Sequence, residues 1–293
     1  ANPVGELAGA EARERSLLAA ARLVGVPVSE LTAKDSVITH RPSGRTTTYG
    51  RVAERAAQTP HPNPETIRIK SPDQWTLMGT ERKNLDVPPK VTGQTIYGID
   101  VRLPGMRWAA VKACPVYGGD VKRYDFEAIR TMPGVRTAVQ FPIPDPSCTR
   151  GRTFSGGVAV IADTWYQAKA AIDRMPIEWN IPPDNAAVNT AMMHDALAAA
   201  IAQPGQVRVD QGDVDAGFAR AAKIVETTYS TPYLARARME PGNATVVVTN
   251  DRVAIWIGEQ SPQEKRFSAS KITGVPEQNV YIHLCHLGGG YGR

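Results

Sequence analysis

The sequence predicts an α+β fold, in which short strands and short helices follow one another in mixed order. Three observations support this class. The chain has 293 residues, which is enough for one large domain or two ordinary ones. It contains 25 Gly and 23 Pro, which indicates many turns between short elements. From Val91 onward, segments of alternating apolar and polar residues are interspersed with segments of helical periodicity.

Composition and charge exclude several classes of protein. The chain is 42% hydrophobic and 22% charged, which is typical of globular proteins and unlike collagen, disordered chains or coiled coils. No apolar run reaches the ~18–20 residues that a membrane span needs. The net charge of +5 comes from scattered basic residues, which argues against nucleic-acid binding. Cys114, Cys148 and Cys285 form no Cys-x-x-Cys motif, so no zinc or iron–sulfur site is expected within the chain, and a disulfide is not indicated.

The part of the chain before Pro89 predicts two helices and a hairpin, followed by a connector. Gly25 is positioned to end the first helix, because glycine readily adopts the left-handed conformation at a helix C-terminus. The elements are expected at residues 11–24 (helix), 36–49 (hairpin) and 51–57 (helix). Residues 58–89 are rich in proline and are interpreted as an ordered connector that covers Trp75, Leu77 and Met78. This connector is the best candidate for a domain boundary.

From Val91 the pattern predicts a compact α+β unit of about one hundred residues. The continuous apolar run Gly157–Ala162 indicates a buried strand. Asp163 is expected to cap the helix that follows, whose inward face would be Ala168, Ala171 and Ile172. The expected strands are 96–101, 107–113, 135–141, 157–162 and 177–179, and the expected helices are 126–131 and 164–174.

The remaining part of the chain carries the clearest local signal. Ser261-Pro262-Gln263-Glu264 predicts a capping box at the start of a helix that ends at Gly274. Asn250-Asp251 indicates the turn of a hairpin. The expected helices are 187–202, a short helix that follows residues 212–215 and runs through Ala222, and 262–272. The expected strands are 223–231, 245–249, 252–258 and 280–287.

The glycine loop, Gly288–Gly292, has two interpretations. Glycine lets backbone N–H groups approach an anion closely, so this loop is suited to cradle a phosphate-bearing cofactor. The alternative is a flexible tail or a tight turn, which local sequence alone favours. The loop is neither a P-loop nor a dinucleotide fingerprint. No Gly-x-Ser-x-Gly motif supports a hydrolase.

Two further clusters have both a functional and a structural interpretation. His283, Cys285 and His286 resemble a metal site, but strand alternation places His286 on the opposite face, so a structural role is favoured. Glu240 follows Arg236 and Arg238, and its carboxylate is either an active-site group or a member of an internal ion pair. The ion pair is the favoured interpretation.

Six segments of the chain, in this order, match one known pattern. They are LDVPPKVTGQTIYGIDVRLPGMRWAAV (85–111), MPGV (132–135), GVAVIADTWYQAKAA (157–171), GDVDAGFARAAKIVETTYSTPYLARARMEPGNATV (212–246), EQSPQ (259–263) and LGGGYGR (287–293). Together they resemble the molybdenum-cofactor-binding subunits of the xanthine oxidase family, in particular the isoquinoline 1-oxidoreductase β-subunit type, which also includes bacterial aldehyde dehydrogenases. Each segment is weak alone, whereas their number and order are specific.

The resemblance implies a domain organisation and a chemistry. Residues 1–79 resemble part of a molybdopterin-binding domain plus a connector, residues 80–182 an α/β hammerhead domain, and residues 183–293 the first part of a molybdopterin-binding domain. Such enzymes hydroxylate an aldehyde or an N-heteroaromatic substrate with water as the oxygen source, and the cofactor carries the chemistry. The implied cofactor is a molybdopterin-type molybdenum cofactor, with the cytosine dinucleotide form among its variants. Electrons leave through [2Fe-2S] clusters on a partner.

The resemblance also implies site residues. The cofactor is expected to contact the glycine loop with its neighbour Arg293, and Gln260, while Glu240 lies near the site. Tyr291 stands where the family usually has Phe. The residues carried over as cofactor-binding are Gly288, Gly289, Gly290, Tyr291, Gly292, Arg293 and Gln260. The family's catalytic base is expected C-terminal of Arg293, so no catalytic residue and no direct metal ligand is assigned within this chain.

Because the base is expected beyond Arg293, the chain is interpreted as one portion of a larger subunit, cleaved or separately encoded. The expected partners are the remaining portion of that subunit, a small [2Fe-2S] subunit and, as a further candidate, a cytochrome c subunit. The resemblance points to the periplasm, with the cytoplasm as the other compartment considered. The competing class is a non-catalytic scaffold of the same fold that holds no cofactor, and analysis for molybdenum would discriminate the two.

Overall fold

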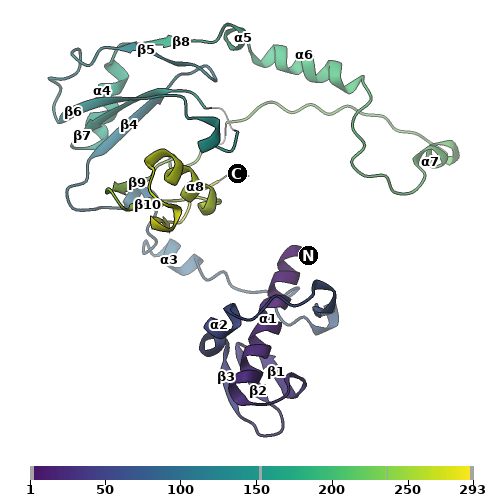
Figure 1. Cartoon of the computed structure of the whole chain (residues 1–293). Coiled ribbons are helices and arrows are strands. Elements are labelled where there is room, and N and C mark those ends of the chain that lie inside the picture. Colours follow the sequence, from purple (N-terminus) through teal and green to yellow (C-terminus); the bar gives the residue numbers. More distant parts are fainter. Residues whose placement is uncertain (1–2, 152–153, 236, 291–293) are drawn as a thin grey trace. The chain divides into compact units, whose positions relative to one another are not determined.

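The computed structural model describes residues 3–151, 154–235 and 237–290. The chain divides into two compact units, one up to Val87 and one from Pro88 onward, and each is described by itself. Both units combine helices with strands, so the α+β class that the sequence predicts is confirmed (Figure 1). A short helix, α3 (Val87–Val91), lies at the junction of the two units.

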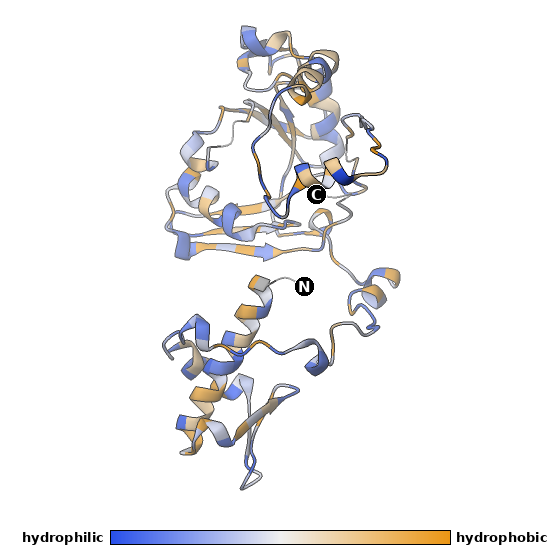
Figure 2. Cartoon of the chain, turned by 90° about the vertical axis from the view of Figure 1, so that its right-hand side faces the viewer, coloured by the Kyte–Doolittle hydropathy of each residue, from blue (hydrophilic) through white to orange (hydrophobic). Residues whose placement is uncertain are grey.

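The first unit is built on one long helix, α1 (Pro3–Val24). Hydrophobic and hydrophilic residues are mixed along α1 (Figure 2), and its buried side chains are mostly small, such as Ala20, with Leu17 the largest. Gly25 ends the helix with a φ of 73°, and its N–H donates to the carbonyl of Ala21 (2.8 Å), as predicted. The helix begins earlier than residue 11, because Glu6, Leu7 and Ala8 also favour helix and Pro is tolerated in a first turn.

A three-stranded antiparallel sheet packs with α1 in this unit. Its strands are β1 (Leu31–Lys34), β2 (Val37–His40) and β3 (Thr46–Thr48), in that order, and α2 (Tyr49–Ala57) follows. The predicted hairpin and second helix are confirmed, whereas β1 was not predicted. Ile38 and Val52 are fully buried between the sheet and the helices. This unit therefore has a hydrophobic core of its own.

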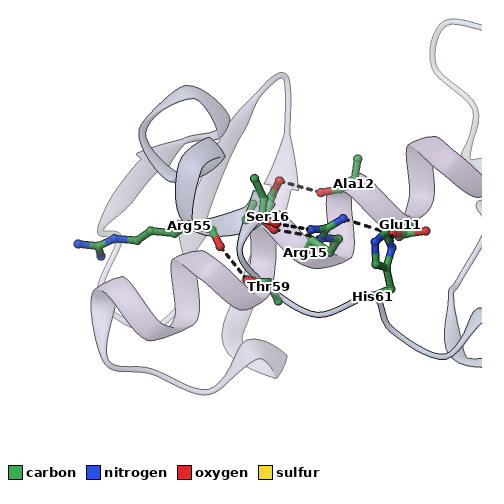
Figure 3. Close-up of polar contacts among 9 residues, drawn as sticks. Glu11, Ala12, Arg15, Ser16, Arg55, Thr59 and His61 are labelled. Atoms are coloured by element: carbon green, nitrogen blue, oxygen red, sulfur yellow. Dashed lines mark hydrogen bonds and ion pairs between the residues drawn. The ribbon is translucent and has the colours of Figure 1, made fainter. Parts of the chain in front are cut away.

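Arg15 of α1 connects α1 to the end of α2 through hydrogen bonds (Figure 3). Its guanidinium donates to the carbonyl oxygens of Ala56 (3.1 Å) and Ala57 (2.7 Å), at the end of α2. Glu11 lies 3.5 Å from the same guanidinium and 2.5 Å from Nδ1 of His61. A cation at a helix C-terminus satisfies carbonyls that have no partner within the helix and complements the helix dipole.

The connector after α2 contains two single-turn 3₁₀ helices, η2 (Pro64–Thr66) and η3 (Pro72–Gln74), and no strand among its described residues. Trp75 is half-buried, and its Nε1 donates to the carbonyl of Lys70 (3.2 Å). Leu77 and Met78 are 65% and 44% exposed, so their predicted cover is wrong. A chain with so many prolines donates few backbone hydrogen bonds, and it stays on the surface.

The main core of the second unit lies between an antiparallel sheet and one helix. The sheet has the order β4 (Trp108–Ala113), β7 (Gly157–Ala162), β6 (Val135–Phe141). Because β7 is the central strand, it is apolar throughout, as predicted. The helix α4 (Trp165–Arg174) contacts β4 and β7 and buries Ala168, Ala171 and Ile172, which confirms the predicted inward face.

A separate strand pair, β5 (Asp120–Tyr124) with β8 (Ile177–Asn180), adds to this core through Val121. The strand β5 was not predicted, because Gly118-Gly119 and charged residues surround it. The helix predicted over 126–131 is wrong. Those residues form turns, in which Ile129 N–H donates to the carbonyl of Phe126 (3.0 Å) and the Ile129 side chain is fully buried.

Two local predictions in this unit fail for identifiable reasons. Residues 96–101 form a 3₁₀ turn, η4 (Gly98–Asp100), and not a strand, because the carboxylate of Asp100 accepts the N–H of Tyr97 (3.0 Å) and closes the turn. Thr164, not Asp163, caps α4 by accepting the N–H of Gln167 (3.3 Å). Asp163 instead pairs with Arg136 (2.6 Å) and Arg107, and these hydrogen bonds and charges lower the pKa of its carboxyl.

After β8 the chain carries three helices, α5 (Pro183–Ala186), α6 (Thr190–Ile201) and α7 (Val214–Arg220), none of which buries a side chain. The strand predicted over 223–231 is wrong. These residues pair with no strand among the described residues, and Ile224, Val225 and Tyr229 are exposed. An alternating pattern forms a strand only where a neighbouring strand completes its hydrogen bonds.

The final part of the second unit contains a β-α-β arrangement. The antiparallel hairpin of β9 (Thr245–Val248) and β10 (Val253–Ile257) is confirmed, and β10 pairs in parallel with β11 (Val280–Leu284). The helix α8 (Pro262–Thr273) connects the parallel strands and ends at Gly274, as predicted. A small core of Val253, Val275 and Val280 joins the helix to the sheet.

The predicted capping box at the start of α8 is wrong in its main contact. The side chain of Ser261 accepts no capping hydrogen bond, although Ser261 is the N-cap residue. Glu259 instead fixes the approach to the helix, because its Oε1 accepts the N–H groups of Gln260 (2.8 Å) and Ser261 (3.2 Å). Its pKa is lowered, because these hydrogen bonds and Lys265 outweigh the opposing effect of burial, which is the largest single contribution.

Within the ranges given above, none of the helices combines the length and the apolar character that a membrane crossing requires. The three cysteines are all free thiols.

Candidate functional site

The candidate site lies where β10 and β11 end. Because these strands are parallel, their carboxyl ends meet at the same edge, and Cys285 N–H donates to the carbonyl of Ile257 (3.0 Å) just beyond it. Gly258 packs against the chain that leaves β11, since a Cβ built there would lie 3.1 Å from the carbonyl oxygen of His286. The crevice outside the carboxyl ends of parallel strands is the usual place for ligands in α/β sheets. The glycine loop begins at this edge.

Glu240 contacts the first residue of the glycine loop. Its Oε2 accepts the N–H of Gly288 (2.7 Å), and its own N–H donates to the carbonyl of Gly288 (3.2 Å). A Cβ built on Gly288 would lie 2.3 Å from Cβ of Glu240, which is closer than real Cβ atoms come. Gly289 follows with a φ of 107°. Only glycine therefore permits this approach at position 288.

The turn η4 meets Glu240 from another part of the unit. Oε1 of Glu240 accepts the N–H of Ile99 (3.1 Å) and Nδ2 of Asn243 (2.9 Å). A Cβ built on Gly98 would lie 2.6 Å from Oδ1 of Asn243, so this contact also depends on glycine. The backbones of Tyr97 and His286 form a parallel bridge, and their rings meet edge to face at 6.5 Å. Three segments that are distant in sequence thus converge on one carboxylate.

An open depression of about 470 Å³ lies over this convergence. Three segments supply its lining: the approach to η4, the turn around Glu240, and the start of the glycine loop. The lining residues are Lys90, Tyr97, Ile99, Asp100, Met239, Glu240, Leu287, Gly288 and Gly289. The lining offers backbone groups, one ammonium group and two carboxylates, which suits a polar ligand.

Two ionisable groups at the depression have perturbed pKa values. Burial raises the pKa of Glu240, but the hydrogen bonds from Asn243, Gly288 and Ile99 together outweigh it, so the pKa is lowered. Burial and the nearby charges of Glu240 and Asp100 raise the pKa of the Cys285 thiol. Glu240 is therefore held as a carboxylate, and Cys285 as a neutral thiol.

The structure describes five of the eight residues that the resemblance implies for the site, namely Gly288, Gly289, Gly290, Gln260 and Glu240. Gly288 and Gly289 line the depression, and Glu240 touches Gly288. Gln260 is exposed, two residues after Gly258 at the same strand edge. Tyr291, Gly292 and Arg293 lie outside the described residues. The expected ion pair between Glu240 and Arg238 does not form, while Arg236 also lies outside the described residues.

Sequence reasoning missed Ile99 and Asn243, which complete the carboxylate's hydrogen bonds. Ile99 contributes only its backbone, which no side-chain pattern reveals. Asn243 lies in the turn Glu240-Pro241-Gly242-Asn243, and asparagine in such a turn commonly bonds to neighbouring groups. The tendency of asparagine to form hydrogen bonds within such a turn was the signal in the sequence that could have identified Asn243.

The histidines near this edge have packing partners. His283 stacks on Trp256 at 4.5 Å between ring centroids, and His286 meets Tyr97. No group of three or more His, Cys, Asp or Glu side chains is arranged to hold a metal ion within the part of the chain that the structure describes.

Comparison with known proteins gives three similarities. Residues 193–293 match the molybdopterin cofactor-binding domain family. The chain is 28% identical to isoquinoline 1-oxidoreductase subunit beta of Brevundimonas diminuta, over 98% of this chain and 40% of the relative. It is also 28% identical to the membrane-bound aldehyde dehydrogenase [pyrroloquinoline-quinone] of Gluconacetobacter polyoxogenes, over 98% of this chain and 37% of that protein.

The fold is also found in a solved structure. Quinoline 2-oxidoreductase from Pseudomonas putida 86 superposes with a TM-score of 0.51 at 20% identity, over 73% of this chain and 31% of that one. The chain thus spans less than half of the length of each of these three proteins. Its glycine loop falls inside the matched domain and at the carboxyl edge of β10 and β11. The chain is thus similar, over nearly its whole length, to a portion of larger oxidoreductase subunits, and its last hundred residues match a molybdopterin cofactor-binding domain.

Proposed function

We propose that this chain is part of a molybdenum hydroxylase that oxidises an aldehyde or an N-heteroaromatic substrate, with water as the oxygen source. The observation that carries the proposal is the position of the glycine loop, inside the matched cofactor-binding domain and at the open edge of two parallel strands. Both substrate classes are represented by the names of relatives, one an isoquinoline oxidoreductase and one an aldehyde dehydrogenase. These names do not separate the two classes for this chain.

The described residues fit a large polar cofactor at this edge. Gly288 tolerates no side chain, and Gly289 has the left-handed φ that frees the backbone to turn around a ligand. We propose that Gly288, Gly289 and Gly290, together with Tyr291, Gly292 and Arg293, line the molybdenum and its pterin, and that the exposed amide of Gln260 offers a further polar contact. The cofactor supplies the two-electron oxidation, and the chain binds and orients it.

We assign no general base to this chain. Glu240 is the carboxylate at the depression, but three N–H groups already occupy its oxygens and its pKa is lowered. A general base needs a free oxygen and a pKa near the working pH, so Glu240 is suited to hold the backbone. The base is proposed to lie in the portion of the subunit that follows Arg293.

The domain organisation and partners complete the proposal. Residues 1–79 and 183–293 are assigned to molybdopterin-binding domains, and residues 80–182 to a hammerhead domain. The antiparallel sheet of β4, β7 and β6 with α4 falls inside this last range. A small [2Fe-2S] subunit receives the electrons, and a cytochrome c subunit is a further candidate partner. The cofactor is assigned the cytosine dinucleotide form. The competing proposal is a scaffold of this fold without cofactor.

Metal and pterin analysis of the purified, complete assembly tests the function. We expect molybdenum close to one atom per copy of this chain, pterin fluorescence after acid release, and cytidine monophosphate in the hydrolysate. Dye-linked oxidation of benzaldehyde and isoquinoline, measured side by side, then separates the substrate classes. An assembly that contains no molybdenum, or that contains quinone in its place, contradicts the proposal and favours the scaffold or a quinone enzyme.

Gln260→Ala is expected to lower dye-linked activity by about tenfold, since a lost hydrogen bond to a ligand costs ~1–2 kcal/mol. Gln278→Ala is the matched control, because Gln278 is equally exposed but precedes β11 and so lies at its opposite end. The two variants are compared at equal molybdenum content. Equal activity of both variants would remove Gln260 from the site.

A further inference from the structure

Glu240 holds three segments of the second unit through one side chain. Its carboxylate accepts the N–H of Gly288, the N–H of Ile99 and Nδ2 of Asn243, at 2.7, 3.1 and 2.9 Å. Ile99 and Gly288 are separated from it by 141 and 48 residues of chain. Neither segment is joined to the other by secondary structure beyond the single bridge of Tyr97 with His286.

The contact with Gly288 is reciprocal. The Glu240 side chain accepts the N–H of Gly288, and the Glu240 backbone N–H donates to the Gly288 carbonyl (3.2 Å). The first bond fixes the peptide plane before Gly288 and the second fixes the plane after it. The pair therefore sets the direction in which the glycine loop leaves β11.

We propose that Glu240 is a positioning residue, whose carboxylate fixes the start of the glycine loop in the orientation that receives the cofactor. This inference rests on the proposed function, because it assumes that the loop binds the molybdenum cofactor. Hydrogen bonds to an ionised acceptor are shorter and stronger than neutral ones, so a carboxylate suits this role. Its ionised form is the one that three N–H donors require.

The geometry distinguishes this role from general packing. Glu240 forms no ion pair with Arg238, and its oxygens accept hydrogen bonds from backbone and amide N–H groups. Gly98 and Gly288, which flank it, have no room for a Cβ. At Gly98 and Gly288 the backbone can thus approach Glu240 closely, and a residue with a side chain would prevent this approach.

Hydrogen–deuterium exchange of the complete assembly tests the proposal. Glu240→Ala is expected to speed exchange of a peptide covering Cys285–Gly290 by about tenfold, since it removes a hydrogen bond to a charged group. Exchange of Val253–Ile257, inside the sheet, should not change. Molybdenum content should fall with the loosening of the loop.

Glu240→Gln provides the conservative comparison. Glutamine has one acceptor oxygen, so it can serve either Gly288 or the pair of Ile99 and Asn243, and it should restore exchange and molybdenum content in part. Asp251→Asn removes a carboxylate in the turn between β9 and β10, at the opposite end of β10, and it should leave exchange of Cys285–Gly290 unchanged.

Two outcomes overturn the positioning role. One is unchanged loop exchange in Glu240→Ala, and the other is a loosened loop with unchanged molybdenum content. Both are distinct from failure of the proposed function, which would appear as absence of molybdenum from the unmodified assembly, whatever the exchange of the variants.

Discussion

Replacing Gly288 with alanine is expected to lower the molybdenum content of the complete assembly by about tenfold or more, because overpacking costs ~1–3 kcal/mol and each 1.4 kcal/mol is a factor of ten. The new Cβ would lie 2.3 Å from Cβ and 2.8 Å from Oε2 of Glu240. Neither atom can withdraw without breaking the contacts of Glu240 with Ile99 and Asn243. The loop must therefore move away from the strand edge.

Gly242→Ala is the matched control, since it lies in the same turn as Glu240. Its Cβ would approach only the mobile end of the Arg238 side chain, at 3.1 Å, so molybdenum content should be unchanged. Metal analysis at equal protein concentration measures both variants. A Gly288→Ala assembly with full molybdenum content would show that the loop tolerates displacement, and the close approach at Gly288 would then have no bearing on the cofactor.

Ile172→Ala is expected to destabilise the core of the second unit by about 2–5 kcal/mol, which is the range for truncating a buried aliphatic side chain. Ile172 is 1% exposed and packs from α4 into the cluster that contains Val158 and Val160 of β7. Removing its outer carbons leaves a cavity that the flanking sheet cannot close. Exchange of the Gly157–Ala162 amides should accelerate accordingly, because these amides open with the core.

Tyr166→Ala on the same helix provides the comparison. Tyr166 is 77% exposed, so its truncation should change the free energy of unfolding by less than about 0.5 kcal/mol. Hydrogen–deuterium exchange of the β7 peptide, measured in the full chain for both variants, compares the effects of the two substitutions. Equal effects of the two substitutions would mean that α4 does not seal this core.

The sequence predicts best where local pattern and tertiary packing agree. The apolar run of β7, the inward face of α4 and the hairpin of β9 with β10 are confirmed, because each carries its burial pattern in adjacent residues. Residues 96–101 alternate like a strand, yet the carboxylate of Asp100 closes a turn there. Residues 223–231 also alternate, but no described strand pairs with them. In the first case a side-chain hydrogen bond closes a turn within the segment itself, and in the second case no neighbouring strand among the described residues completes the backbone hydrogen bonds.

At the candidate site, too, local features could be predicted from the sequence, whereas tertiary contacts could not. The glycine loop and its place after a strand follow from the sequence. The role of Glu240 does not, because its partners are backbone N–H groups and its arginine neighbours suggested an ion pair. The residue types in a sequence reveal charge and volume. Which distant backbone N–H groups a carboxylate binds is decided by the tertiary fold. The sequence therefore lacked one kind of information, which is where Ile99 and Gly288 lie relative to the Glu240 carboxylate.

The convergence on Glu240 also has a kinetic consequence. The contacts of Ile99 with Glu240 and of Glu240 with Gly288 close loops of 141 and 48 residues. Closing long loops is entropically costly, and long-range contacts slow folding. The helix–sheet core of β4, β7 and α4 lies within the longer loop, so its local contacts can form before the ends meet. The contact of Ile99 with Glu240 is consequently expected to form after this core, because the paired residues of β4 and β7 are closer together in the sequence.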